Sequence, residues 1–168
     1  MRLTEWRAAA PHRDALGTKV LTVLEPVLRA LGAEDDPHVW VDWGEDPSYR
    51  YTLLVPTAAG LGVCAVRPGG GPDGPRIGAK LVRWGRVQLG ELTIETQAGH
   101  RLATVQLEGQ VLRGVDDDGD RVARFVRAVA AGIDGRPVPS LDEPKASARR
   151  TTVTTAPGGR PRTRRAGS

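Results

Sequence analysis

Three short runs of alternating apolar and polar residues between residues 38 and 66 constrain the fold more than any other feature of the chain. The runs are His38 to Trp43, Tyr49 to Val55 and Leu61 to Val66. A period of two is typical of β-strands, because successive side chains of a strand point to opposite faces of the sheet. The links between the runs are too short for a crossover helix, so the sequence predicts an antiparallel meander.

Helical periodicity is found on both sides of this region. Residues 12–31 carry apolar side chains at steps of three and four, and Gly32 suits the residue just after a helix end. Pro26 lies inside this pattern and predicts a bend or a break, because proline lacks the N–H that the helix needs. A second helix is predicted to begin within residues 116–120, whose four aspartates suit an N-cap and a first turn, and to end near Ile133.

Residues 75–86 fit either a helix or a strand. In the strand alternative, the segment would pair with residues 87–95. In a helix, Pro75 takes a first-turn position, which suits proline. Gly78 disfavours the helix by about 1 kcal/mol relative to alanine. The helix is nevertheless the preferred prediction, because the apolar residues then fall at steps of four and three: Ile77, Leu81 and Trp84.

A β-hairpin is predicted after this segment. Two alternating runs, Glu91 to Gln97 and His100 to Glu108, flank the dipeptide Ala98-Gly99, which suits a tight turn. The element order is then α-βββ-α-ββ-α. We therefore predict an α+β domain over residues 1–134, with a single antiparallel sheet of about five strands packed by N-terminal, middle and C-terminal helices. Residues 135–168, rich in Arg, Pro and Gly, are predicted to form a disordered tail.

The charge of the chain is unevenly distributed. The 168 residues carry a formal net charge of +4, but residues 1–134 hold 16 Lys and Arg against 18 Asp and Glu, and residues 135–168 hold 8 against 2. The positive excess therefore belongs to the tail. No stretch approaches the ~18 apolar residues of a membrane span, and residues 1–10 lack the apolar core of a signal peptide, so we expect a cytoplasmic protein without membrane contact.

The sequence shows no pattern of catalytic or metal-ligating residues. The glycine spacing at residues 69–74 resembles a dinucleotide fingerprint, but Pro72 interrupts it and a loop is favoured. Cys64 lies in an apolar run and is expected to be a buried hydrophobe. Three histidines are far apart in the chain: His12, His38 and His100. We therefore predict no enzymatic activity and no cofactor or metal, with a small-ligand site or an enzyme as the less favoured alternative.

Aromatic residues of the strand region are divided between two faces. Trp43, Tyr49 and Tyr51 share the face that is expected to meet a helix, so core packing is favoured for them. Trp40 points the other way. It is therefore expected to be exposed and is the candidate contact with a partner.

The tail carries six arginines that are candidate phosphate contacts: Arg149, Arg150, Arg160, Arg162, Arg164 and Arg165. No acidic residue follows Glu143, and such a segment can bind nucleic acid with a strong dependence on salt. A solubilising segment without a binding role is an equal alternative.

Three segments resemble the type III secretion chaperones, including their YbjN-like bacterial relatives. They are VWVDWGEDPSYRYTLLV at 39–55, LVRWGRVQLGELTIE at 81–95 and DRVARFVRAVAAGI at 120–133. The resemblance implies a non-catalytic, chaperone-like or adaptor domain that holds an extended segment of a partner protein, often as a homodimer. The segment would bind in a groove between helix and sheet, or by strand addition at a sheet edge.

Overall fold

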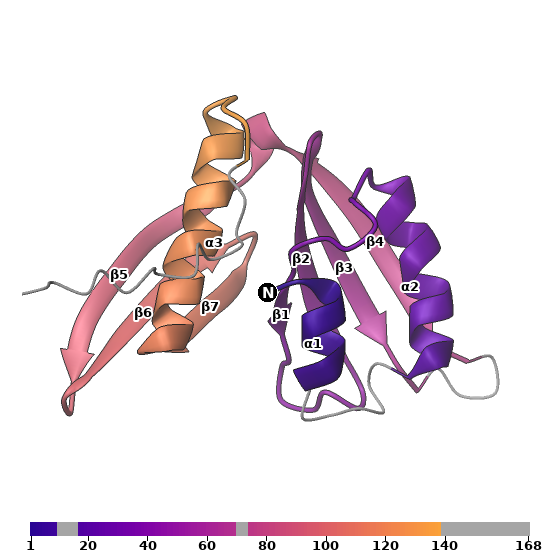
Figure 1. The fold of residues 1–168 in the computed structure, drawn as a ribbon, viewed down its shortest axis with the longest axis horizontal. Coiled ribbons are helices and arrows are strands. Elements are labelled where there is room, and N and C mark those ends of the chain that lie inside the picture. Colours follow the sequence, from indigo (N-terminus) through magenta and orange to yellow (C-terminus); the bar gives the residue numbers. More distant parts are fainter. Residues whose placement is uncertain (10–16, 70–73, 139–168) are drawn as a thin grey trace, which may run out of the picture.

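The computed structural model describes residues 1–9, 17–69 and 74–138. These residues form an α+β fold with two antiparallel sheets and helices at both ends of the chain (Figure 1). In chain order, the elements are α1 (Leu3–Ala9), α2 (Thr18–Ala30), β1 (Trp40–Asp42), β2 (Tyr51–Thr57), β3 (Gly60–Arg67), β4 (Arg76–Arg83), the 3-10 helix η3 (Trp84–Arg86), β5 (Leu89–Gln97), β6 (His100–Leu107), β7 (Gln110–Val115) and α3 (Asp117–Ile133).

The strands form two meanders, and the prediction of a single five-stranded sheet is wrong. Sheet 1 has the order β1-β2-β3-β4 and sheet 2 the order β5-β6-β7. The predicted antiparallel meander of the first three strands is confirmed. The sheets separate at η3, where residues 84–86 turn the chain so that β5 pairs with β6 instead of β4.

The predicted middle helix over residues 75–86 is also wrong, because most of this segment is strand β4. The strand pairs along its whole length with β3, and Ala79 lies opposite Cys64. The glycine at position 78 is a poor helix residue, and the strand places Ile77 against the core beneath α2. As a strand, this segment forms backbone hydrogen bonds with β3 and also directs Ile77 into the core.

The N-terminal region folds as two helices. Helix α2 begins at Thr18 and continues through Pro26 to Ala30, so the predicted break does not occur. The proline lies on an exposed position of the helix. Helix α1 has no counterpart in the predicted elements. It is fixed by backbone hydrogen bonds of 3.0 Å from Leu3 N to the Pro37 carbonyl and 2.9 Å from Val39 N to the Met1 carbonyl.

Sheet 1 has a hydrophobic core on each of its faces. Alternation along β2 sends Leu53 to the core beneath α1 and α2, and Leu54 to the core shared with α3 and sheet 2. Figure 1 shows α1 and α2 beside sheet 1, and α3 alongside sheet 2. The first core contains a cluster of aromatic rings with centroids 5.3–5.8 Å apart, formed by Trp6, Trp43 and Tyr51.

Sheet 2 is packed by α3, and both were predicted in part. The hairpin at Ala98-Gly99 is confirmed, with φ of 51° and 86° at its two turn residues. Strand β7 was not predicted. Its Gly114 allows α3 to approach, because a Cβ there would lie 2.4 Å from the Asp118 carbonyl. Helix α3 begins after Asp116 as predicted, but the Asp116 side chain makes no capping bond and contacts His100 and Arg101 of β6 instead.

Candidate functional site

The candidate contact Trp40 is less exposed than predicted. It does point away from Val41 and Trp43, but that face of sheet 1 is covered by α3, and the Trp40 ring lies 6.0 Å from that of Phe125. A sheet with a helix on only one face would have left Trp40 in solvent. Its role as a partner contact stays a prediction, and the structure places it at the edge of a core.

The core-packing prediction for the other aromatic residues is confirmed for two of them and wrong for one. Core packing is confirmed for Trp43 and Tyr51. It is wrong for Tyr49, whose side chain is 66% exposed because β2 begins only at Tyr51. Cys64 is fully buried as expected, and burial raises the pKa of its thiol to about 11, so the thiol is protonated at neutral pH.

Most of the remaining candidates do not converge on one site. The six tail arginines and His12 lie outside the described residues. His38 lies beside the N-terminus and His100 at the start of β6. Residues 1–9, 17–69 and 74–138 contain no group of three His, Cys, Asp or Glu side chains placed to hold a metal ion. The helices in these ranges include none with the length and hydropathy needed to span a bilayer.

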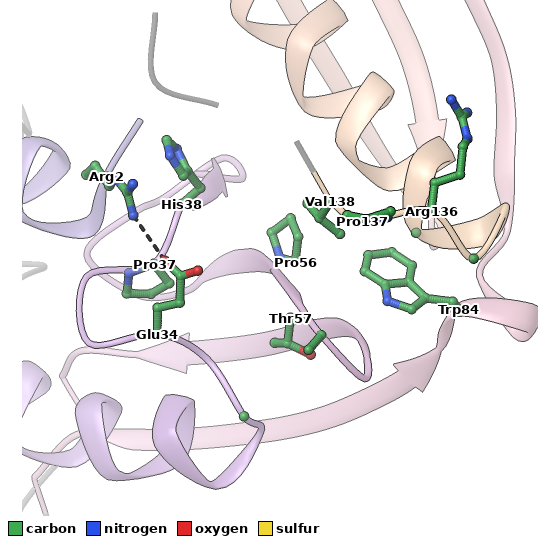
Figure 2. Close-up of a pocket in the computed structure, with 14 residues that line it drawn as sticks. Arg2, Glu34, Pro37, His38, Pro56, Thr57, Trp84, Arg136, Pro137 and Val138 are labelled. Carbon is green, nitrogen blue, oxygen red and sulfur yellow. Dashed lines mark hydrogen bonds and ion pairs between the residues drawn. The ribbon is translucent and has the colours of Figure 1, made fainter. Parts of the chain in front are cut away.

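A pocket of about 600 Å³ lies where the ends of several elements meet, and we call it the junction pocket. Figure 2 shows Trp84, Pro56 and Pro137 facing this space, with Arg2 and His38 across it. The Trp84 ring is held against α3 at Gly132, where an added Cβ would lie 2.6 Å from the indole. Such a volume is within the range of small-ligand pockets.

The charged groups around the junction pocket are largely neutralised within the molecule. Arg2 lies 3.3 Å from the Glu34 carboxylate and donates a hydrogen bond of 2.8 Å to the Asp36 carbonyl. Arg136 pairs with Asp134 at 2.6 Å. The rest of the lining combines the polar residues Thr57 and His38 with the Trp84 ring and proline side chains, and the ring and prolines suit contact with an uncharged apolar group.

Asp36 fixes the N-terminal wall of this pocket. Its carboxylate accepts hydrogen bonds from the backbone N–H of Thr4, at 2.9 Å, and from the Thr4 hydroxyl, at 2.7 Å. Burial raises the pKa of Asp36, but the bonds from Thr4 and the charge of Arg2 outweigh it and hold the pKa below its usual value. The ionised carboxylate therefore ties α1 to the connector before β1.

Strand β5 is the longest strand among the described residues and lies at an edge of sheet 2. It is nine residues long, and in the described part of the chain it pairs with β6 alone. None of its residues is buried. Ile94 lies opposite the buried Ala103 of β6 but is itself 56% exposed, because α3 packs over β6 and β7. The free edge of β5 therefore presents backbone N–H and C=O groups to solvent.

The free edge of β5 also carries charge of one sign. Glu91 and Glu95 are exposed and make no ion pair with any described residue. Sequence patterns predicted a strand here, but the position of that strand in the sheet was missed. Whether a strand has one neighbour or two depends on pairing with distant segments, which local periodicity does not contain.

No protein family model, curated protein or solved structure matches this chain. The resemblance to type III secretion chaperones accordingly stays an expectation from the sequence. The geometry of the sites is the basis on which function can be proposed.

Proposed function

We propose that this chain is a non-catalytic, chaperone-like or adaptor module that binds an extended segment of a partner protein by strand addition to β5. The observation that carries the proposal is a nine-residue outer strand whose second edge has no partner among the described residues. Strand addition would satisfy the free N–H and C=O groups of this edge through main-chain hydrogen bonds. A long, exposed edge is otherwise a liability for aggregation.

The side chains of β5 indicate the chemistry of the partner segment. An apolar residue of the partner would cover Ile94, which is exposed on the α3 side. Basic residues on the partner would neutralise Glu91 and Glu95. A second copy paired antiparallel about Thr93 would instead place Glu91 opposite Glu95 of the other copy. The resulting like-charge repulsion favours a basic protein segment over a β5-to-β5 homodimer.

The test is capture of protein partners from the native cell with wild-type protein and with an I94D/E95K variant. Both positions are exposed, so the variant should unfold at the wild-type temperature. We expect it to lose the partner, and we expect hydrogen exchange to show protected β5 amides in the wild-type complex. A V111T variant, exposed on β7, is the matched control and should retain the partner.

Three results would contradict the proposal. One is a partner that binds the I94D/E95K variant as tightly as wild type. Another is a complex whose newly protected amides lie outside β5. The third is recovery of nucleic acid in place of protein.

The second candidate function is nucleic-acid binding by the tail, proposed because six arginines and no acidic residue follow Glu143. It predicts that removal of residues 145–168 abolishes binding to an oligonucleotide, and that affinity falls steeply with salt. Undiminished binding after truncation would exclude it. The truncated chain retains β5, so the two candidate functions are separable in one pair of proteins.

A further inference from the structure

Three arginines line a second hollow, which differs from the junction pocket because half of its lining residues are cations. Arg50 comes just before β2, Arg67 ends β3 and Arg76 begins β4. They line a space of about 320 Å³ whose other walls are Ala65, Ile77 and Gly78. We call this the arginine hollow. It is separate from β5 and from the residues of the junction pocket.

The pairing of the strands forces two of these cations together. Arg67 and Arg76 are direct cross-strand partners in the β3–β4 register. Like charges directly opposite each other destabilise an antiparallel pair. Arg50 adds a third positive charge from the segment that precedes β2. The three charges therefore repel one another when no ligand is bound, and an anion that contacts all three would relieve this repulsion.

No carboxylate of the described residues pairs directly with these arginines. None of the three arginines forms an ion pair or a side-chain hydrogen bond there. Arginines elsewhere in the same ranges do find acids, as Arg101 does with Asp120 and Arg121 with Asp118 at 2.7 Å. Within the described ranges, therefore, no side chain occupies the donors of the three guanidinium groups.

Small residues keep the hollow open. Ala65 and Gly78 are direct partners across the same two strands, two positions from the Arg67–Arg76 pair and on the same face of the sheet. A Cβ added at Gly78 would meet no heavy atom within 4 Å, so the space above this glycine is empty. A larger side chain at position 78 would occupy the space in which a ligand contacts the arginines.

We propose that the arginine hollow binds a small ligand through a phosphoryl or diphosphoryl group. Guanidinium groups present donors in a fixed fork that matches phosphate oxygens, and such charge-assisted bonds are the strong ones. Three cations balance the charge of a diphosphate at neutral pH. The volume of about 320 Å³ is at the lower end of the range for small-molecule sites, which suits one such group and a short attachment.

The test is calorimetric titration of the whole chain with inorganic pyrophosphate at low ionic strength. We expect R67Q and R76Q each to weaken binding about tenfold or more, as for loss of a charge-assisted hydrogen bond. The matched control is R83Q, which removes the same charge from the other end and the other face of β4. It should change affinity about twofold at most, since it retains the hollow and loses only long-range attraction.

A second variant tests the shape of the hollow without a change in charge. G78V fills the open space with a residue that favours strands, so the melting temperature should be maintained or raised. Pyrophosphate affinity should nevertheless fall about tenfold or more, as with the arginine variants. A folded G78V protein that binds like wild type would show that the anion does not occupy this space, and would overturn the proposal.

Titration with other phosphorylated compounds identifies the kind of molecule that carries the phosphoryl group. Binding of a nucleoside triphosphate with the same sensitivity to R76Q supports a small phosphorylated metabolite as the ligand. The proposal fails if pyrophosphate does not bind wild-type protein, if R83Q weakens binding as much as R76Q, or if a single-stranded oligonucleotide binds the hollow and pyrophosphate does not.

Discussion

Sheets 1 and 2 are built from the same kind of meander but are covered differently. Sheet 1 is packed on both faces around β2, where six of the seven residues are buried, although its edge strand β4 has no buried residue. Sheet 2 is packed on one face by α3, and β5 has no buried residue. A central strand covered on both faces, such as β2, joins two cores, whereas the edge strands β4 and β5 leave backbone and side chains exposed.

The difference can be traced to the residues of each strand. The segment Tyr51 to Val55 has only one polar residue, Thr52, and can be buried on both faces. Strand β5 places Glu91, Thr93 and Glu95 between apolar residues, so burial of both faces would bury unpaired charge. The two sheets therefore differ in what their sequences permit them to bury.

The comparison predicts its largest effect in β2. Leu53 and Leu54 are adjacent and both fully buried, but they belong to cores on opposite faces of sheet 1. We expect L53A and L54A each to lower the free energy of unfolding by about 2–5 kcal/mol, as for leucine truncation in other cores. Urea denaturation followed by circular dichroism measures both. A loss below about 1 kcal/mol for either variant would mean that one face of sheet 1 is not a true core.

Local sequence patterns predicted the elements whose contacts are mainly between neighbours in the chain. The strands before residue 67, the Ala98-Gly99 hairpin and α3 all agree with the structure. Turn residues and periodicity encode these directly. Strand β4 was missed because Ile77, Leu81 and Trp84 also fit helical spacing, and the choice depends on β3, a separate element.

The two-sheet arrangement and the candidate sites depend on tertiary contacts. Trp40 was expected in solvent because one sequence cannot show that α3 returns to cover the second face of sheet 1. The arginine hollow was likewise hidden, since Arg67 and Arg76 become neighbours only through the register of β3 and β4. The sequence revealed the absence of local motifs. It could not reveal a surface that forms only when distant segments come together.

The junction between the sheets predicts the next largest effect. In G132A, the new methyl group would lie 2.6 Å from the Trp84 ring, which must shift. Overpacking of this kind costs about 1–3 kcal/mol, while alanine gains about 1 kcal/mol over glycine in helix propensity. We expect a net loss of stability in wild-type background. In W84A background the same change should stabilise the protein, and a double-mutant cycle by urea denaturation measures this reversal of sign. Equal effects in both backgrounds would show that Trp84 does not contact α3.

A smaller effect is expected at the far end of sheet 2, where Asp116 joins β6 to α3. Its carboxylate lies 2.8 Å from His100 Nδ1 and accepts a 3.0 Å hydrogen bond from Arg101 N. The hydrogen bond with the His100 side chain is the main cause that holds the pKa of Asp116 below its ordinary value of 3.8. The stabilising contribution is therefore complete above this value and is lost as the pH falls through the lowered pKa.

The D116N variant tests this contribution, because asparagine keeps an acceptor for Arg101 N and tolerates the positive φ of 50° at this position. We expect a small loss of stability at pH 7 and a flatter fall in melting temperature below about pH 4 than in wild type. D117N, which carries no resolved interaction in the first turn of α3, is the control. Parallel wild-type and D116N curves would contradict the assignment.

The smallest effect is expected on the open face of sheet 2, and it tests the comparison at neighbouring residues of one strand. In β7, Leu112 is fully buried beneath α3, whereas Val111 is 53% exposed on the other face. We expect L112A to cost about 2–5 kcal/mol and V111A to change stability by no more than about 0.5 kcal/mol, measured by the same urea titration. In β2, the corresponding neighbours are both costly because both faces are covered. A large loss for V111A would mean that the outer face of sheet 2 is packed in solution, for example by a second copy, and a dependence of that loss on protein concentration would identify the copy as its cover.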